Sequence, residues 1–176
     1  MLGQVTSVRC GTCRRRTGLE AGGRCARCWR TVVESGDEAG RAEAARRREV
    51  PGWVVAALAA DRSPLVRAEV AARPDLPAAV VAVLADPRTE TDPTVLRRMA
   101  AHPRLGARAL ALAGAGDVVA LRRLADNPAT SPDALAVLAA HPDPSVHRRA
   151  RARVVGAQLD EAARRRLPVG LRRFLT

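Results

Sequence analysis

Residues 51–74 read PGWVVAALAADRSPLVRAEVAARP, and the chain then repeats this stretch with variations to about residue 154. A Leu-Ala pair marks each copy, and successive pairs are separated by 26, 28 and 26 residues, beginning at Leu58, Leu84, Leu112 and Leu138. Self-similarity at a period of a few tens of residues is typical of proteins built from stacked repeats. The sequence therefore predicts about four units of 25–28 residues.

Each unit divides into two short helical segments. Pro51 and Pro77 precede the Leu-Ala marker, and we predict them at the first helical position, where the missing N–H of proline costs nothing. The second segment starts at a capping side chain, usually followed by proline, at Ser63-Pro64, Asp92-Pro93, Asp117 and Asp143-Pro144, and Ser131-Pro132 opens the fourth unit in the same way. Segments of about eight to ten residues are too short to be stable alone. Stacking must stabilise them, which predicts an all-α helical solenoid.

The second segments close on a residue followed by proline, at Arg73-Pro74, His102-Pro103 and Asn127-Pro128. Together with the period and the Leu-Ala markers, these steps resemble the leucine-rich repeat variant family over about residues 50–154. The resemblance implies a right-handed superhelix in which short α-helices alternate with 3₁₀ helices. It also implies that an N-terminal cysteine module holding a [4Fe–4S] cluster can precede the repeats.

All four cysteines of the chain lie near its beginning, in two CxxC pairs separated by eleven residues: Cys10 and Cys13, then Cys25 and Cys28. Each CxxC bends so that two sulfurs point at one position, and two such knuckles complete a tetrahedral thiolate site. A module this small has little apolar content, so a metal would supply its folding free energy, about 10 kcal/mol or more for structural zinc. We therefore predict a zinc-ribbon-like module that binds Zn²⁺ through these four cysteines.

Other chemistry is compatible with the same residues. Four thiolates can also hold an iron–sulfur cluster, which would make the protein a redox or electron-transfer protein. Two disulfides are the third interpretation, and a reducing cytosol disfavours them. The even spacing of the two pairs favours zinc over a [4Fe–4S] cluster.

Positive charge is concentrated at both ends of the chain. Residues 1–49 carry 11 arginines and 6 acidic residues, residues 50–144 carry 10 of each, and residues 145–176 carry 9 arginines and 2 acidic residues. Arginines around the knuckles are candidates for contacting nucleic-acid phosphates: Arg14, Arg15, Arg16, Arg24 and Arg27. The simpler interpretation is a solvated basic surface, because aromatic residues, which stack on bases in single-strand and RNA binders, make up only 2% of the chain.

The sequence divides into four predicted segments: the cysteine module (1–33), a connecting helix (34–49), the repeats (50–154) and a basic helical cap (155–176). Ser35 and Glu38 form a capping-box pattern for the connecting helix, whose alternating charges predict an exposed helix. Trp53 is predicted to have a core role, packed between the linker of the cysteine module and the first repeat. Arginines and the apolar residues Leu159, Leu167, Leu171 and Phe174 are expected to cover the end of the array.

The function that these patterns favour is a non-enzymatic scaffold that binds a protein partner on the solenoid face. His102, His141 and His147 fall at repeat positions and are predicted to be structural, and no catalytic triad, carboxylate pair or phosphate-binding loop is evident. The chain shows neither a secretory signal nor a membrane-spanning apolar run, so we expect a cytoplasmic protein. Iron–sulfur redox chemistry and nucleic-acid binding through the basic ends are the alternatives.

Overall fold

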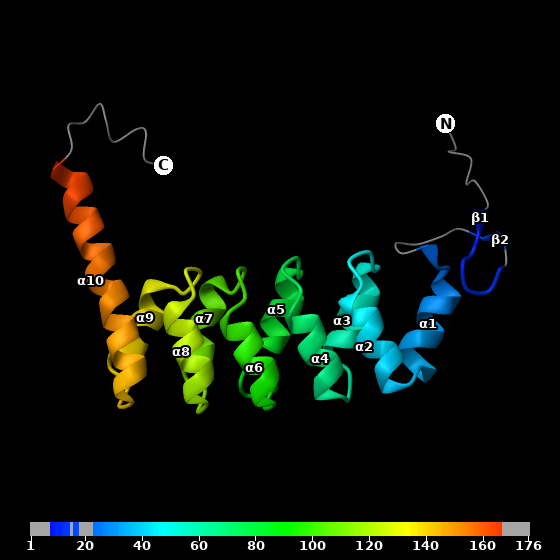
Figure 1. The fold of residues 1–176 in the computed structure, drawn as a ribbon, viewed down its shortest axis with the longest axis horizontal. Coiled ribbons are helices and arrows are strands. Elements are labelled where there is room, and N and C mark those ends of the chain that lie inside the picture. Colours follow the sequence, from blue (N-terminus) through cyan, green and yellow to red (C-terminus); the bar gives the residue numbers. More distant parts are fainter. Residues whose placement is uncertain (1–7, 15, 18–22, 167–176) are drawn as a thin grey trace.

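The computed structural model describes residues 8–14, 16–17 and 23–166, which form a row of short helices following one another in chain order (Figure 1). Besides the helices, the described residues include one antiparallel pair of two-residue strands, β1 (Val8–Arg9) and β2 (Arg16–Thr17). The prediction of an all-α protein is therefore confirmed.

The helices form pairs, and each pair packs on the pairs before and after it. The first members of the pairs are α1 (Ala26–Ser35), α3 (Gly52–Ala59), α5 (Ala78–Leu84), α7 (Ala109–Leu112) and α9 (Pro132–Ala139). The second members are α2 (Glu38–Arg46), α4 (Pro64–Ala71), α6 (Pro93–Ala100), α8 (Val118–Asp126) and α10 (Pro144–Arg166). Each even helix contacts the next even helix, and odd helices contact one another at α1–α3, α3–α5 and α7–α9.

Both segments of each unit are α-helices, so the expected alternation of α and 3₁₀ helices is wrong. Seven residues suffice for α5 to bury Val80, Val81 and Leu84 on one face, which is the spacing of an α-helix. A 3₁₀ turn, η2 (Gly106–Arg108), precedes α7. Leu105 lies seven residues before the marker of this unit, where the first two units have Pro51 and Pro77. The next residue, Gly106, adopts a φ of 51°, a conformation from which an α-helix does not propagate.

Most of the predicted helix starts are confirmed. Asp92 and Asp117 each accept hydrogen bonds from two backbone N–H groups of the helix that follows, and Ser131 accepts one from Ala134. Pro51 and Pro77 are the residues before their helices rather than the first helical ones. The hydroxyl of Ser63 makes no capping bond, because the turn is closed instead by the Ser63 N–H, which donates to Asp61 Oδ1 at 2.8 Å.

The predicted exposed connecting helix is instead part of the row. Helix α2 buries four residues, Arg41, Ala42, Ala44 and Ala45, and packs against α4 as α4 packs against α6. Its cap is Asp37, whose side chain accepts from the Gly40 N–H at 2.7 Å. Ser35 cannot cap it because Ser35 is the last residue of α1. The predicted boundary after residue 33 lies inside α1.

One apolar core runs through the row from Trp29 to Ala150. Trp29 is fully buried, whereas Trp53 is 41% exposed. The tryptophan that joins the cysteine module to the repeats is therefore Trp29, and the interpretation of Trp53 as the joining residue was wrong. Among the described helices, none combines the length and apolar character required to cross a membrane.

A ladder of donor side chains joins the C-terminal ends of the even helices. A residue one or two positions after α4, α6 or α8, and Arg153 within α10, donates to carbonyls at the end of the even helix before it. Arg73 bonds the Ala45 and Arg47 carbonyls, His102 bonds that of Arg73, Asn127 bonds those of Ala100 and His102, and Arg153 bonds those of Ala125 and Asn127. We call Arg73, His102, Asn127 and Arg153 the donor ladder.

Arginines near the middle of the even helices also join them to the unit that follows. The guanidinium of Arg41 binds Asp61 through two hydrogen bonds, of 2.6 and 3.1 Å. Arg67 binds Glu90 in the same manner, at 2.6 and 2.9 Å. Arg97 pairs with Asp117 at 2.8 Å, and Arg122 lies 3.7 Å from Asp143. Each junction between even helices is thus held at both ends by polar contacts around an apolar centre.

Helix α10 does not stop where the earlier even helices stop. Val154 follows Arg153 of the donor ladder at the position where the other units have Pro74, Pro103 and Pro128. Without a proline, the backbone hydrogen bonds continue and the helix extends to Arg166. The predicted cap residues from Leu167 onward lie outside the described residues.

Candidate metal centre

The two CxxC pairs occupy turns of similar geometry. Cys10 follows β1, and the turn closes with the Arg14 N–H donating to the Cys10 carbonyl at 3.0 Å. Cys25 is the N-cap residue of α1, and there the Trp29 N–H donates to the Cys25 carbonyl at 3.1 Å. In both cases the residue four positions after the first cysteine bonds back to it, so the two sulfurs of each pair are on one side of the turn.

A backbone contact holds the two turns together. The Gly11 N–H donates to the Gly23 carbonyl at 3.3 Å, and Gly23 adopts a φ of 69°, where side chains are strained. Arg14 also has a positive φ, of 59°, which ends the first turn and directs the chain towards β2. Two short segments far apart in the sequence are thereby brought to a common point.

The four sulfurs form a compact cluster. All lie within 4.8 Å of one another, and the Cys10–Cys28 and Cys13–Cys25 pairs are each 3.8 Å apart. These separations exclude sulfur–sulfur bonds, which are about 2.0 Å long, and all four thiols are free. The disulfide interpretation is therefore wrong, and the cluster has the composition and size of a site for a metal ion.

Burial differs among the four ligands. Cys10, Cys25 and Cys28 are at most 9% exposed, whereas Cys13 is partly exposed. Cys10 accepts a hydrogen bond from the Cys25 N–H at 3.5 Å, so the sulfur faces a backbone donor as well as the other thiols. Cys13 is therefore the ligand that solvent reaches most readily.

The electrostatic environment favours thiolate at one position and thiol at another. Backbone N–H donors of Cys13, Cys25 and Thr12 lower the pKa of Cys10 to about 6. Burial, with contributions from the neighbouring cysteine side chains, raises the pKa of Cys28 to about 12. Four thiolates this close together repel one another, and a bound cation would favour their ionisation.

The candidate phosphate-binding arginines do not form one described cluster. Arg14 and Arg27 are exposed, and Arg24 places its guanidinium 5.0 Å from the centre of the Trp29 ring, in cation–π contact. The Arg16 backbone belongs to β2, and its side chain lies outside the described residues, as does all of Arg15. Of the arginines in this group whose side chains are described, Arg24 packs against a tryptophan ring.

Sequence reasoning missed the residue that attaches the metal centre to the row. Trp29 directly follows Cys28 and is fully buried in the apolar core of the row. Its signal was present in the sequence, because Trp29, Val32 and Val33 have the i, i+3, i+4 spacing of an apolar helix face. The second knuckle is consequently the first turn of a helix that belongs to the row.

The histidines are structural wherever the structure gives them contacts. His102 is 3% exposed; its Nε2–H donates to the Arg73 carbonyl at 2.8 Å and its Nδ1 accepts from the Arg104 N–H at 3.1 Å. His141 accepts a hydrogen bond from the Asp143 N–H at 3.1 Å. Because Arg73 O can only accept, His102 is held as the Nε2–H tautomer.

Comparison of the chain with protein-family models, with curated proteins and with solved structures gives no match.

Proposed function

We propose that the protein is a non-enzymatic scaffold in which a structural Zn²⁺ ion, bound by Cys10, Cys13, Cys25 and Cys28, fixes one end of a helical solenoid. The observation that carries the proposal is the separation of the sulfurs. Four sulfurs at about 2.3 Å from one tetrahedral ion lie about 3.8 Å from one another. The Cys10–Cys28 and Cys13–Cys25 sulfurs are each 3.8 Å apart, and all four sulfurs lie within 4.8 Å of one another.

The size of the cluster favours a single ion over an iron–sulfur cluster. In a [4Fe–4S] cluster each cysteine binds a different iron atom, so the four sulfurs stand farther apart than they do around one ion. Zinc with four cysteine ligands has no open coordination position, which supports a structural rather than a catalytic role. Such an ion would hold the first turn of α1 and thereby orient the row.

The solenoid part of the proposal rests on the repeated pairs and the donor ladder. A right-handed path is the one that the resemblance to the leucine-rich repeat variant family implies. The period and the residue-proline steps support that resemblance, while the α-helices in both halves depart from the family pattern. Stacked units of this kind expose long continuous surfaces suited to binding macromolecules.

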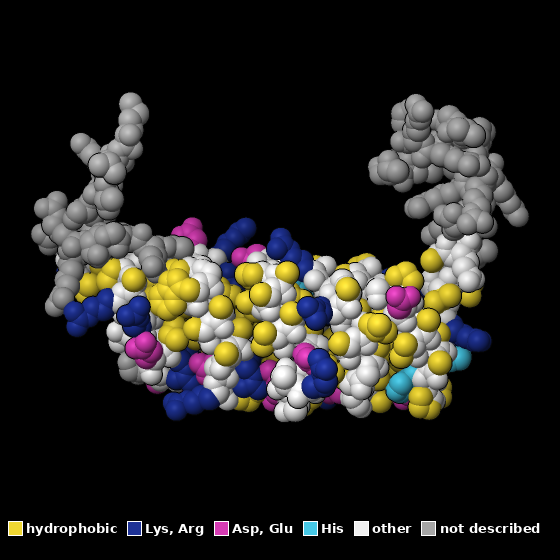
Figure 2. Space-filling view, turned by 180° about the vertical axis from the view of Figure 1, so that it is seen from behind, with side chains coloured by type: hydrophobic (Ala, Val, Ile, Leu, Met, Phe, Trp, Pro, Cys, Tyr) yellow, Lys and Arg dark blue, Asp and Glu magenta, His cyan; other side chains and the backbone are white. Residues whose placement is uncertain are grey.

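The odd helices offer the surface for a protein partner. Their outward positions are mostly small and uncharged, and one large apolar side chain on each of four consecutive odd helices is 41–52% exposed: Trp53, Val83, Leu110 and Val137. Hydrophobic atoms are visible along the length of the row in Figure 2. Exposed apolar side chains on successive helices of this kind fit a protein partner better than a polyanion.

Metal analysis with visible spectroscopy, on protein purified without oxygen, tests the metal assignment. We expect one zinc per chain and no visible absorbance. Cys25→Ser should abolish stoichiometric zinc, whereas Arg27→Ala, an exposed change on the same turn, should keep it. Iron with acid-labile sulfide would overturn the proposal and establish the redox alternative.

A second candidate function, nucleic-acid binding, is favoured by the placement of the basic ends. The strands of the cysteine module and the C-terminal part of α10 project from the same side of the row (Figure 1). Residues 1–49 and 145–176 carry net charges of +5 and +7. Binding to duplex or single-stranded DNA should then weaken steeply with added salt, because counterions are released. Absent or salt-insensitive binding would eliminate this candidate.

A further inference from the structure

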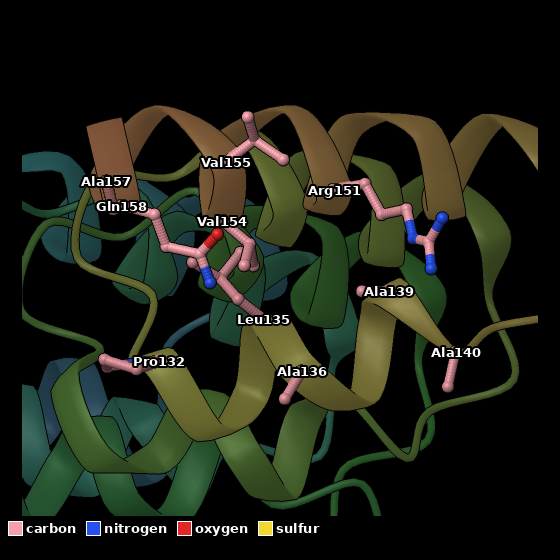
Figure 3. A pocket seen from close by; sticks show the side chains of 10 residues that line it. All are labelled: Pro132, Leu135, Ala136, Ala139, Ala140, Arg151, Val154, Val155, Ala157 and Gln158. Carbon is pink, nitrogen blue, oxygen red and sulfur yellow. The ribbon is translucent and has the colours of Figure 1, made fainter. Parts of the chain in front are cut away.

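The last pair of helices leaves an apolar groove at its outer side. The groove lies between α9 and α10 and has a volume of about 1010 Å³. Leu135 of α9 and Val154 of α10 lie between the two helices, and Arg151 and Gln158 are the polar residues of the lining (Figure 3). Val155 at the groove is 52% exposed, which is unusual for a valine beside a packed core.

The groove is where another odd helix would lie if the row continued. Interior odd helices pack on helices of the pair before them: α5 packs on α3 and α4, α7 on α6, and α9 on α7 and α8. The solvent exposure of the alanine in each Leu-Ala marker shows whether a following helix covers that unit. Ala59, Ala85 and Ala113 are 4%, 1% and 5% exposed, whereas Ala139 is only partly buried. The last unit therefore lacks a cover that the first three have.

The sequence that follows α10 repeats the pattern of an odd helix. Residues 167–175 read LPVGLRRFL, and residues 76–84, which form α5 and its lead-in, read LPAAVVAVL. In both nine-residue stretches the first residue is apolar and precedes proline. The fifth residue is apolar and the ninth is leucine. In the α5 copy these three are Leu76, Val80 and Leu84, at 1%, 5% and 1% exposed. The equivalent residues of the later copy are Leu167, Leu171 and Leu175.

The segment is long enough to return to the groove. Gln158, the lining residue nearest the end of α10, is eight residues before Arg166, or about 12 Å along a helix. Ten further residues can span up to about 33 Å. Pro168 does not continue the helix that precedes it, and Gly170 adopts reversals readily, so a return is compatible with this sequence.

The polarity of the segment suits a terminal unit. Val55, Val81 and Leu135 occupy one repeat position, three residues before the leucine of the marker, and are 6%, 2% and 7% exposed. In residues 167–175 this position is Arg172. Terminal units of solenoids carry a polar outer face where interior units are apolar, because no further unit covers them.

We propose that residues 167–175 form a further odd-type helix that packs into the groove between α9 and α10 and closes the row. This inference is independent of the metal and of any partner. The apolar groove is then part of the core, and binding partners must use another surface.

Amide hydrogen exchange of the full chain, followed by mass spectrometry, tests this packing. Residues 167–175 should be protected, and the pair Leu171→Ser and Leu175→Ser should speed exchange there by about tenfold or more. The matched pair Arg172→Ser and Arg173→Ser, on the outward side, should leave exchange nearly unchanged. Unprotected exchange of the segment in the unaltered protein would overturn the proposal.

A change on the opposite side of the contact supplies the second measurement. Ala139→Arg fills the groove and should deprotect residues 167–175, whereas Ala56→Arg, at an exposed position of α3, should not. If protection falls on dilution, a second copy of the chain occupies the groove and the proposal is wrong. Protection that is independent of concentration and lost only in the groove variant supports it.

Discussion

Arginine has two different roles in this chain, and burial separates them. The side chains of Arg41 and Asp61 are 5% and 7% exposed, and Arg41 also donates to the Gly36 carbonyl at 2.6 Å. The Arg88 side chain, paired with Asp86, is 86% exposed. The sequence could not distinguish these two arginines, because the charge pattern of residues 37–49 looks like that of a solvated helix. Only the packing of α2 against α4 makes Arg41 a buried residue.

Arg41→Ala should destabilise the protein by about 3–5 kcal/mol, because it leaves Asp61 buried without its partner. The matched change Arg88→Ala removes an exposed pair and should cost at most about 1 kcal/mol. Urea unfolding, followed by the helical signal, measures both values. Equal small effects would show that α2 is not packed as described.

Asp61 should contribute to stability in a pH-dependent way. Burial alone would raise its pKa, but the hydrogen bonds from Arg41 and Ser63 and the charge of Arg41 outweigh burial and lower the pKa. A carboxyl with a lowered pKa in the folded state stabilises the protein above the pKa of the unfolded chain, about 3.9, and loses this contribution as the pH falls below it. The urea midpoint of the unaltered protein should therefore decline more steeply below about pH 4 than that of Asp61→Asn.

At the scale of the helices, the N-terminal ends could be predicted from capping residues. The contacts at the C-terminal ends could be predicted only in part. Asp92, Asp117 and Ser131 cap their helices because an oxygen acceptor beside the first turn acts on its own neighbours. The donor ladder was only half predictable. A structural role for His102 was expected from its repeat position, but the carbonyl that it bonds belongs to the preceding unit, which no local pattern encodes.

Substitutions within the donor ladder should follow its hydrogen bonding. His102→Asn places at this position the side chain that Asn127 uses in the next unit, and it should retain much of the stability. His102→Leu leaves the buried Arg73 carbonyl without this donor and should cost about 1–3 kcal/mol. Thermal unfolding of the two variants measures the difference. Equal midpoints would show that the ladder bond at this position adds nothing.

At the scale of the whole molecule, the repeat period, the helix pairs and the four cysteines were evident in the sequence. Their connection was not, because it depends on Trp29, a residue of the cysteine segment whose side chain is buried in the core of the row. Contacts between distant parts of the chain are absent from a row of this type, since each pair packs on its neighbours alone. Stability should accordingly vary along the row.

Removal of the metal should therefore have a local effect that fades with distance. Chelation should speed amide exchange most in α1, less in α3, and little in α8 and α9, because stability passes only between neighbouring pairs. Hydrogen exchange with and without chelator gives the profile. A uniform increase from α1 to α9 would instead indicate one cooperative unit.

The donor ladder also has a consequence for how such a chain can change length. Every interior unit brings a donor for the unit before it and carbonyls for the unit after it, so a duplicated unit inserted in phase would find both partners in place. An insertion of a few residues would instead put the units out of phase and bury a guanidinium or an imidazole with no carbonyl to accept its hydrogen bond. Growth by whole units is thus compatible with the junctions, while small insertions within the even helices are not.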